Sequence, residues 1–273
     1  MNPAVAQPTD GKKVFKELGT CSRTFHFLLN REFGHNRPGE ERASDTLAGG
    51  ILREGHQCGM LWGASLAIGA EAYRTCKDRD QAIRAAVAAT QTVMQSFRER
   101  EGTINCREIT HCNFSSRWSF AKYMITRRYR HCFTLAQEWA PKAVQAAREG
   151  LQASGQAGPC RSCAAEVAER MGATEEQAIM VSGFAGGLGL SGGGCGALAA
   201  AVWMQALKWS REEDRSPYDN PDSQRTLETF LQATHGKMTC REISGKRFQT
   251  VDAHTRFLDQ DGCDALMKVL EMG

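Results

Sequence analysis

The stretch AGGILREGHQCG at residues 48–59 returns as AGGLGLSGGGCG at residues 185–196, without a gap and at an offset of 137 residues. Further along, the tetrapeptide CREI begins at Cys106 and again at Cys240, at an offset of 134 residues. Matching segments in the same order, with small drifts in spacing, are the signature of a repeat whose loops differ in length. The sequence therefore predicts a tandem duplication.

The repeat extends to both sides of these stretches. The offsets decrease steadily, from 139 to 131 residues, over the following pairs: Cys21 and Cys160, Gly34 and Gly172, Cys132 and Cys263. The Gly/Ser/Ala-rich stretch 153–159 is typical of a linker. We therefore expect two modules, at residues 1–152 and 153–273.

Composition limits the class of protein. The chain has 273 residues, 24% of them charged and 41% apolar, which is typical of a globular protein with a substantial core. A net charge of +3 is too small to indicate a nucleic-acid or membrane partner. The uncharged segment Gln177–Leu207 is long enough to span a bilayer, but its glycine run favours two buried helices instead.

The eleven cysteines are read as reduced thiols. Residues 1–10 contain no basic segment followed by an apolar run, so a cytoplasmic location is expected. In that compartment cysteines bind metals or act in redox chemistry rather than form a disulfide framework.

Apolar residues recur at helical spacing, and no sustained two-residue alternation appears. We predict an all-α fold of two pseudo-symmetric helical modules, with cysteines at helix ends and glycine-rich turns. The expected helices cover residues 59–73, 80–101, 140–151, 160–171 and 196–209, and a further helix begins at the capping box Thr174–Gln177. Residues 211–223 are expected to form a loop.

The main chemical signal is a cysteine quartet that occurs twice. Four thiolates that meet at the ends of different helices suit a soft metal centre, and helix N-termini stabilise thiolates. The ordinary alternative is that cysteines fill a core as small apolar side chains. The predicted metal ligands are Cys21, Cys58, Cys106 and Cys132 in the first module, and Cys160 or Cys163, Cys195, Cys240 and Cys263 in the second.

Glycines surround the second cysteine of each quartet. They allow a backbone to approach a bulky group, and their N–H groups can form an anion-binding nest. A tight turn between helices explains them equally well. The predicted cofactor-contacting glycines are Gly55, Gly59, Gly192, Gly193, Gly194 and Gly196.

Two further motifs are weaker. The pattern Gly187-x-Gly189-x-x-Gly192 matches a dinucleotide fingerprint, but the preceding segment is helical rather than a strand. The pair Cys160 and Cys163 forms a CxxC, which is compatible with a redox dithiol. Of these two, the smoother offset favours Cys160 as the ligand.

Other side chains near the quartets have simpler interpretations. His56 and His131 lie close to quartet cysteines and are candidate alternative ligands, yet glycines replace them in the second copy. Cys76 and Cys112 have no counterpart and are expected to be ordinary thiols.

At the quartets the chain resembles the redox-active family named for its C-GCAxxG-C-C cysteine pattern. The first copy carries CGMLWG at residues 58–63 and the second carries CGALAA at residues 195–200, so the last glycine of the motif is Gly63 in one and Ala200 in the other. A related domain in split-Soret cytochrome c holds an iron–sulfur cluster. The resemblance implies a helical fold and cluster binding or electron transfer.

We therefore expect two four-cysteine sites that hold [2Fe–2S] or [4Fe–4S] clusters, for electron transfer or redox sensing with an unidentified redox partner protein. The face-to-face packing of fused copies is also compatible with a homodimer. The alternatives are a thiol/disulfide oxidoreductase that uses Cys160 and Cys163 or pairs of quartet cysteines, and a structural zinc protein. Whether the chain is an enzyme stays open.

Overall fold

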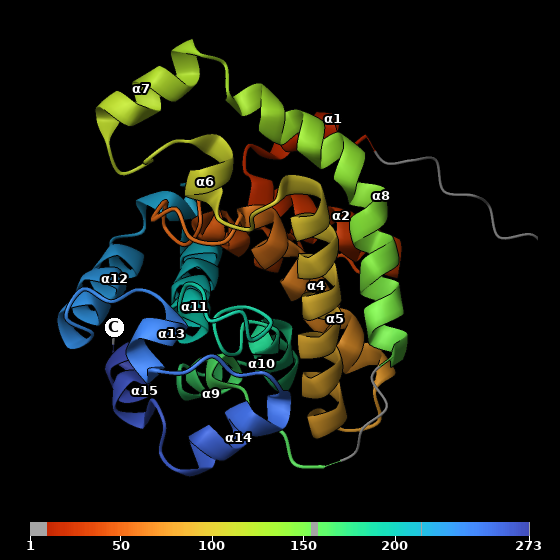
Figure 1. The fold of residues 1–273 in the computed structure, drawn as a ribbon, viewed down its shortest axis with the longest axis vertical. Coiled ribbons are helices and arrows are strands. Elements are labelled where there is room, and N and C mark those ends of the chain that lie inside the picture. The colour runs from red at the N-terminus through yellow and green to blue at the C-terminus, as the bar shows by residue number, and fades with distance from the viewer. Residues whose placement is uncertain (1–9, 154–157, 214, 273) are drawn as a thin grey trace, which may run out of the picture.

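The computed structural model describes residues 10–153, 158–213 and 215–272, and within these ranges it contains helices and no strands (Figure 1). The expected linker falls largely on residues 154–157, which lie outside the described residues. The first module contains α1 (Gly11–Leu18), α2 (Cys21–Phe33), α3 (Pro38–Ala43), the 3-10 helix η1 (Ser44–Leu47), α4 (Gly59–Thr75), α5 (Arg79–Glu101), α6 (Cys106–Thr110), α7 (Arg117–Ile125) and α8 (Tyr129–Ala153). The second contains α9 (Cys163–Arg170), α10 (Glu175–Ser182), α11 (Gly196–Glu212), η2 (Pro217–Asp219), α12 (Pro221–Ala233), α13 (Cys240–Ser244), α14 (Val251–Asp259) and α15 (Asp264–Glu271).

The predicted all-α duplication is confirmed element by element. From α2 to α8 and from α9 to α15 the helices follow the same order, with α10 in the place of α3 and η1. Local sequence signals set their ends: Thr20 caps α2, and Thr174 forms the predicted capping box of α10. Gly34, in the left-handed region, ends α2.

Most predicted helix positions agree with the structure, and one expected loop does not. The segment 211–223 is not a continuous loop, because α11 continues to Glu212 and α12 begins at Pro221. A proline is well accepted at the first position of a helix, where its missing N–H has no partner to lose.

The two modules share a single hydrophobic core. At its centre, the rings of Trp62 and Phe184 meet edge to face across the module boundary, with centroids 4.8 Å apart. The packing is reciprocal: α10 of the second module lies on α4, and α3 of the first lies on α11. The glycine-interrupted stretch 177–207 is therefore two buried helix segments, as predicted, and no helix among the described residues has the length and apolar character to cross a membrane.

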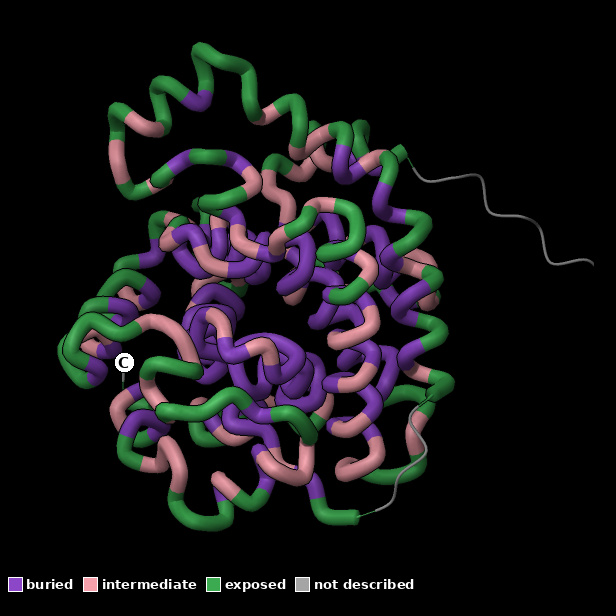
Figure 2. The backbone as a smooth tube through the Cα atoms, viewed as in Figure 1, coloured by how far each residue is buried: buried purple, intermediate pink, exposed green. Residues whose placement is uncertain are grey.

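One helix stands apart from this core. Figure 1 shows α7 projecting from the first module, and Figure 2 shows that it is largely exposed. The side chain of Trp118 is 88% exposed and that of Ile125 is 81% exposed. Tyr123 is the one buried residue of α7, so this helix is only loosely attached to the core.

Candidate redox centres

Each module contains one turn of left-handed helix ahead of its second cysteine. The backbone φ angles of residues 49–53 and of residues 186–190 are all positive, between 47° and 81°. Only glycine adopts this conformation freely, and a residue such as Ile51 costs roughly 1–2 kcal/mol there. The turn is closed by a hydrogen bond of 2.9 Å from Gly55 N–H to the Gly49 carbonyl, and the second module repeats it at the same length.

A short antiparallel bridge then joins the second cysteine of each quartet to the third. The N–H of Cys58 donates to the carbonyl of Ile104 at 2.7 Å, and the N–H of Cys106 donates to the carbonyl of His56 at 2.7 Å. The second module repeats both bonds at its own second and third cysteines, at 2.9 and 2.7 Å. Segments dozens of residues apart in sequence are thereby fixed side by side.

The four cysteines of the first quartet line one cavity of about 740 Å³, which we call the first centre: Cys21, Cys58, Cys106 and Cys132. Each comes from the N-terminal end of a different helix, namely α2, α4, α6 and α8. The structure thus brings together all four residues predicted for this module, and the partial positive charge of four helix ends points at the thiols.

The thiols of the first centre are electrostatically unequal. A hydrogen bond from Cys58 lowers the pKa of the Cys21 thiol, and the same bond together with burial raises the pKa of Cys58. Burial raises the pKa of Cys106, and that of Cys132 to about 12. Cys21 is therefore the thiol that ionises first, and the other three need a positive group nearby before they release their protons.

The quartet of the second module surrounds a far smaller void of about 20 Å³, which we call the second centre: Cys163, Cys195, Cys240 and Cys263. All four again lie at the start of a helix. Burial raises the pKa of Cys195 to about 12 and that of Cys240 to about 11. The walls are apolar and include Phe248 and Phe257, so the space between the thiols is far smaller than in the first centre. Cys240 and Cys263 are nevertheless partly exposed, and Cys263 also lines a separate cavity of about 660 Å³.

The fourth thiol of the second centre belongs to Cys163, and the preference for Cys160 drawn from the offsets is not supported by the geometry. Cys163 is the first residue of α9, as Cys21 is of α2. Because α9 is 8 residues long and α2 is 13, about one turn is missing between the cysteine and the glycine that follows the helix. The cysteine pairing therefore shifts relative to the offset at Gly172.

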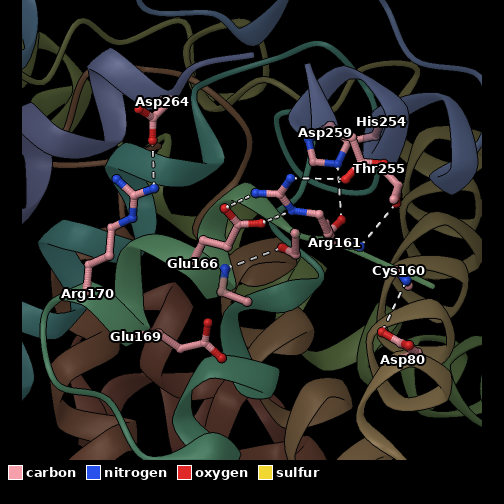
Figure 3. Close-up of polar contacts among 12 residues, drawn as sticks. Asp80, Cys160, Arg161, Glu166, Glu169, Arg170, His254, Thr255, Asp259 and Asp264 are labelled. Carbon is pink, nitrogen blue, oxygen red and sulfur yellow. Dashed lines mark hydrogen bonds and ion pairs between the residues drawn. The ribbon is translucent and has the colours of Figure 1, made fainter. Parts of the chain in front are cut away.

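Cys160 lies elsewhere, in the segment before α9, where it is buried next to the start of α5. Its N–H donates to the Asp80 carboxylate at 3.1 Å, and burial raises the pKa of its thiol to about 11 (Figure 3). Figure 3 also shows the adjacent Arg161 bound to Glu166 and to Asp259. The two sulfurs of the CxxC thus occupy different surroundings.

The side chain of Gln57 links the surroundings of the two centres. Its amide nitrogen donates to the Gly187 carbonyl at 2.6 Å, and its oxygen accepts from Gly194 N–H at 3.0 Å. Glycine is required opposite, since a Cβ on Gly193 would lie 2.0 Å from the Gln57 amide nitrogen. Gly193 and Gly194 therefore receive a side chain of the first module.

The other glycines singled out in the sequence serve close packing. A Cβ on Gly59 would lie 2.6 Å from the Cys21 sulfur, and one on Gly196 would lie 1.9 Å from the Phe184 carbonyl. Gly55 and Gly192 have positive φ and lie against the arginine that follows the third cysteine of their module. Their role in contacting a cofactor stays a prediction, and of the six glycines Gly196 lines the second centre.

The two histidines near the quartets have partners outside the centres. His131 pairs with Glu101 at 2.7 Å on the surface. The ring of His56 lies against Gly194, where burial lowers its pKa. Two cysteines have no counterpart in the other module. Cys76 is half-buried at the end of α4, and Cys112 is buried and accepts a hydrogen bond from the Ser119 hydroxyl at 3.7 Å.

Two groups near the first centre escaped sequence reasoning. The hydroxyl of Tyr123, on α7, lies 3.6 Å from the Cys132 sulfur. The Thr20 hydroxyl donates to the Asp45 carboxylate at 2.5 Å, and burial raises the pKa of Asp45 to about 6. No local motif marks either contact, although the alignment does place Asp45 opposite Ser182 of the second module.

Among the residues that the structure describes, no group of three or more His, Cys, Asp or Glu side chains is arranged to hold a single metal ion. The first centre instead offers four thiols around a space wider than one ion needs. The donor set and the room there fit a cluster, whereas the second centre has the donor set without the room.

Comparison with known proteins agrees with the duplication. A protein-family model described as "Putative redox-active protein (C_GCAxxG_C_C)" matches the chain twice, at residues 20–146 and at residues 160–270. No curated protein and no solved structure matches the chain.

Proposed function

Because the chain belongs to the C_GCAxxG_C_C family of redox-active proteins, with one copy in each module, we propose that it carries electrons through an iron–sulfur cluster held by the thiols of the first centre. The observation that carries this proposal is the convergence of four cysteines, from four helix N-termini, on one cavity. A bound cluster would supply one-electron redox chemistry.

The electrostatics of the site support ligation more than thiol chemistry. Burial raises the pKa of Cys106 and Cys132, so these thiols are poor nucleophiles at neutral pH. A cationic cluster would displace their protons, and the helix N-termini would stabilise the resulting thiolates. The chain itself contributes four ligands and the Tyr123 hydroxyl next to one sulfur.

The second centre is proposed to hold a cluster only after a movement of the chain. Its four cysteines repeat the helix-end arrangement, but the void between them is about 20 Å³. Loading would require α14 or the turn before Cys263 to shift outward. The first centre is therefore expected to load first.

The experiment is anaerobic purification and reconstitution of the full chain, with iron and sulfide measured per chain alongside the visible spectrum. We expect iron and sulfide in equal amounts and a brown colour. Cys106→Ser should abolish loading of the first centre, whereas Cys76→Ser, which changes a half-buried cysteine outside both centres, should leave loading unchanged. Folded protein that takes up neither iron nor sulfide would refute the proposal.

A second candidate function rests on the contact between Cys21 and Cys58. Since the pKa of Cys21 is lowered, its thiolate could attack a substrate disulfide and form a mixed disulfide. Cys58 would then displace the second substrate thiol, so that one protein dithiol and one disulfide become one protein disulfide and two thiols. Loss of two titratable thiols on oxidation, in colourless wild-type protein but not in Cys58→Ser, would favour this chemistry.

A further inference from the structure

Helices α7 and α14 are counterparts in the two modules. Both have nine residues, and both are capped by a hydroxyl side chain, Ser116 in one and Thr250 in the other. The two caps are separated by 134 residues, the same offset as the third cysteines of the quartets. The two helices therefore occupy equivalent positions, each beside the thiols of its own module.

In the second module α14 packs against its centre and fills most of the space between the thiols, while Cys240 and Cys263 stay partly exposed. His254 and Leu258 on its inner face are each 2% exposed. Ion pairs fasten the outer face: Asp252 lies 2.7 Å from Arg84, and Asp259 lies 3.0 Å from Arg161, the latter drawn in Figure 3. The void that remains holds no more than about one water molecule at 20 Å³.

In the first module α7 leaves its centre open. Phe120 and Met124, which occupy the positions of His254 and Leu258, are each 46% exposed. The cavity of about 740 Å³ continues past the thiols to Arg53 on the left-handed turn. This volume lies within the range of small-molecule sites.

The walls of this cavity combine aromatic rings with positive charge. The guanidinium of Arg53 lies 4.3 Å from the ring centroid of Tyr218, which the second module contributes. Arg117 also lines the cavity, and neither arginine forms an ion pair within the part of the chain that the structure describes. The single carboxylate in the lining, that of Glu54, accepts a hydrogen bond from Ser115 at 3.1 Å.

We propose that the cavity of the first centre is a binding site for a small organic anion with a flat apolar body, and that α7 forms its outer wall. The two guanidinium groups would bind the anionic group, because charge-assisted hydrogen bonds from arginine suit carboxylates, sulfonates and phosphates. The rings of Phe114 and Tyr218 would contact the body of the ligand. The arginines and rings of this site are not among the proposed cluster ligands, so the proposal for the metal-free chain does not rest on the cluster.

The test uses two fluorescent probes on the reduced, metal-free full chain: the aromatic sulfonate 8-anilinonaphthalene-1-sulfonate and its uncharged analogue N-phenyl-1-naphthylamine. We expect one sulfonate probe to bind per chain, roughly tenfold or more tightly than the uncharged probe. In Arg53→Gln/Arg117→Gln this preference should disappear, while binding of the uncharged probe changes by less than about twofold.

Two controls keep the result specific. Arg225→Gln/Lys268→Gln removes two cations whose side chains are 63% and 64% exposed, away from the cavity, and should leave the preference intact. Trp118→Ala alters the outer face of α7 without touching the cavity lining and should also have no effect. Any of four results would overturn the proposal. These are equal binding of both probes, an unchanged preference in the arginine variant, absence of binding, and loss of binding in Trp118→Ala. Iron uptake without anion binding would refute this site alone, and the reverse result would refute the cluster alone.

Discussion

Gln57 shows how one side chain can set the spacing of two redox centres. It is fully buried, it directly precedes Cys58, and its amide reaches the glycine that directly precedes Cys195. Both polar atoms of the amide are bonded to groups of the other module, at distances from 2.6 to 3.2 Å. A buried amide with all its partners satisfied specifies a single arrangement of the surrounding backbone.

Removal of this amide should therefore weaken the fold measurably. In Gln57→Ala the buried Gly194 N–H loses its partner, whereas the Gly187 carbonyl keeps the hydrogen bond from the Ser191 hydroxyl. We expect a loss of roughly 1–3 kcal/mol in the free energy of unfolding. The measurement is urea unfolding of the metal-free chain. Gln145→Ala, which removes an exposed bond to Glu149 on α8, is the matched control and should change stability by less than about 0.5 kcal/mol.

Asp45, which accepts a hydrogen bond from the Thr20 hydroxyl, gives the stability of the first module a pH dependence. Burial raises the pKa of its carboxyl to about 6, above the value of ~3.9 in an unfolded chain. The folded state thus binds this proton more tightly, so ionised Asp45 lowers stability above pH 6 and the penalty disappears as the pH falls toward 4.

Asp45→Asn should remove that penalty while its side-chain oxygen still accepts the Thr20 hydrogen bond. We expect the free energy of unfolding to rise by roughly 1–3 kcal/mol near neutral pH and to be unchanged near pH 4. Urea midpoints at a series of pH values, compared with those of the exposed control Asp219→Asn, would test this. A constant difference across the series would show that Asp45 does not titrate as described.

At the residue scale the sequence predicted the quartets well and the fourth thiol of the second module poorly. Order and spacing were enough to identify Cys58, Cys106 and Cys132 together, because both copies keep them. The distinction between Cys160 and Cys163 depends on the missing turn of α9, and the sequence offsets do not show that α9 is shorter than α2.

At the scale of elements, helical periodicity identified the long helices but not the left-handed turns. Positive φ at three successive residues from Ile51 to Arg53 contradicts their local preference. The closing hydrogen bonds and the packing of the turn against the third cysteine impose it, and these are tertiary interactions that no residue pattern encodes. The closure of α14 and the openness of α7 were missed for the same reason.

The contrast between α7 and α14 should appear as a difference in thiol reactivity. In the reduced, metal-free protein we expect iodoacetamide to modify the partly exposed Cys21 and Cys132 faster than the buried Cys163 and Cys195, as followed by peptide mass spectrometry. Opening the second centre requires breakage of the two ion pairs of α14, each worth ~0.2–1 kcal/mol.

Asp252→Asn/Asp259→Asn should therefore speed modification of the buried Cys195 by roughly threefold or more without changing that of Cys132. Equal rates for both centres in the wild-type chain would mean that α14 does not control access to the second centre.

At the scale of the whole molecule, the two modules share one core, and we expect them to unfold as one unit. The core is continuous, and Phe184 of the second module packs directly on Trp62 of the first. Composition and length left open one domain or two, because a repeat in sequence says nothing about how much surface the copies bury against each other.

Damage to one module should accordingly destabilise the other. We expect Phe184→Ala to cost roughly 3–5 kcal/mol and to lower the hydrogen-exchange protection of α5, a first-module helix, by the same amount. Unchanged protection in α5 would show that the modules unfold separately. Coincidence of circular dichroism and tryptophan fluorescence in urea gives an independent check.

The contact between Gln57 and Gly194 determines whether one half of the molecule could take the place of the other. In a pair of two first halves, Gln57 of each would meet His56 and Gln57 of the other instead of Gly193 and Gly194. In a pair of two second halves, no glutamine would fill the space beside these glycines. At this contact each half therefore fits the other half and not a second copy of itself, so the two repeats are no longer interchangeable.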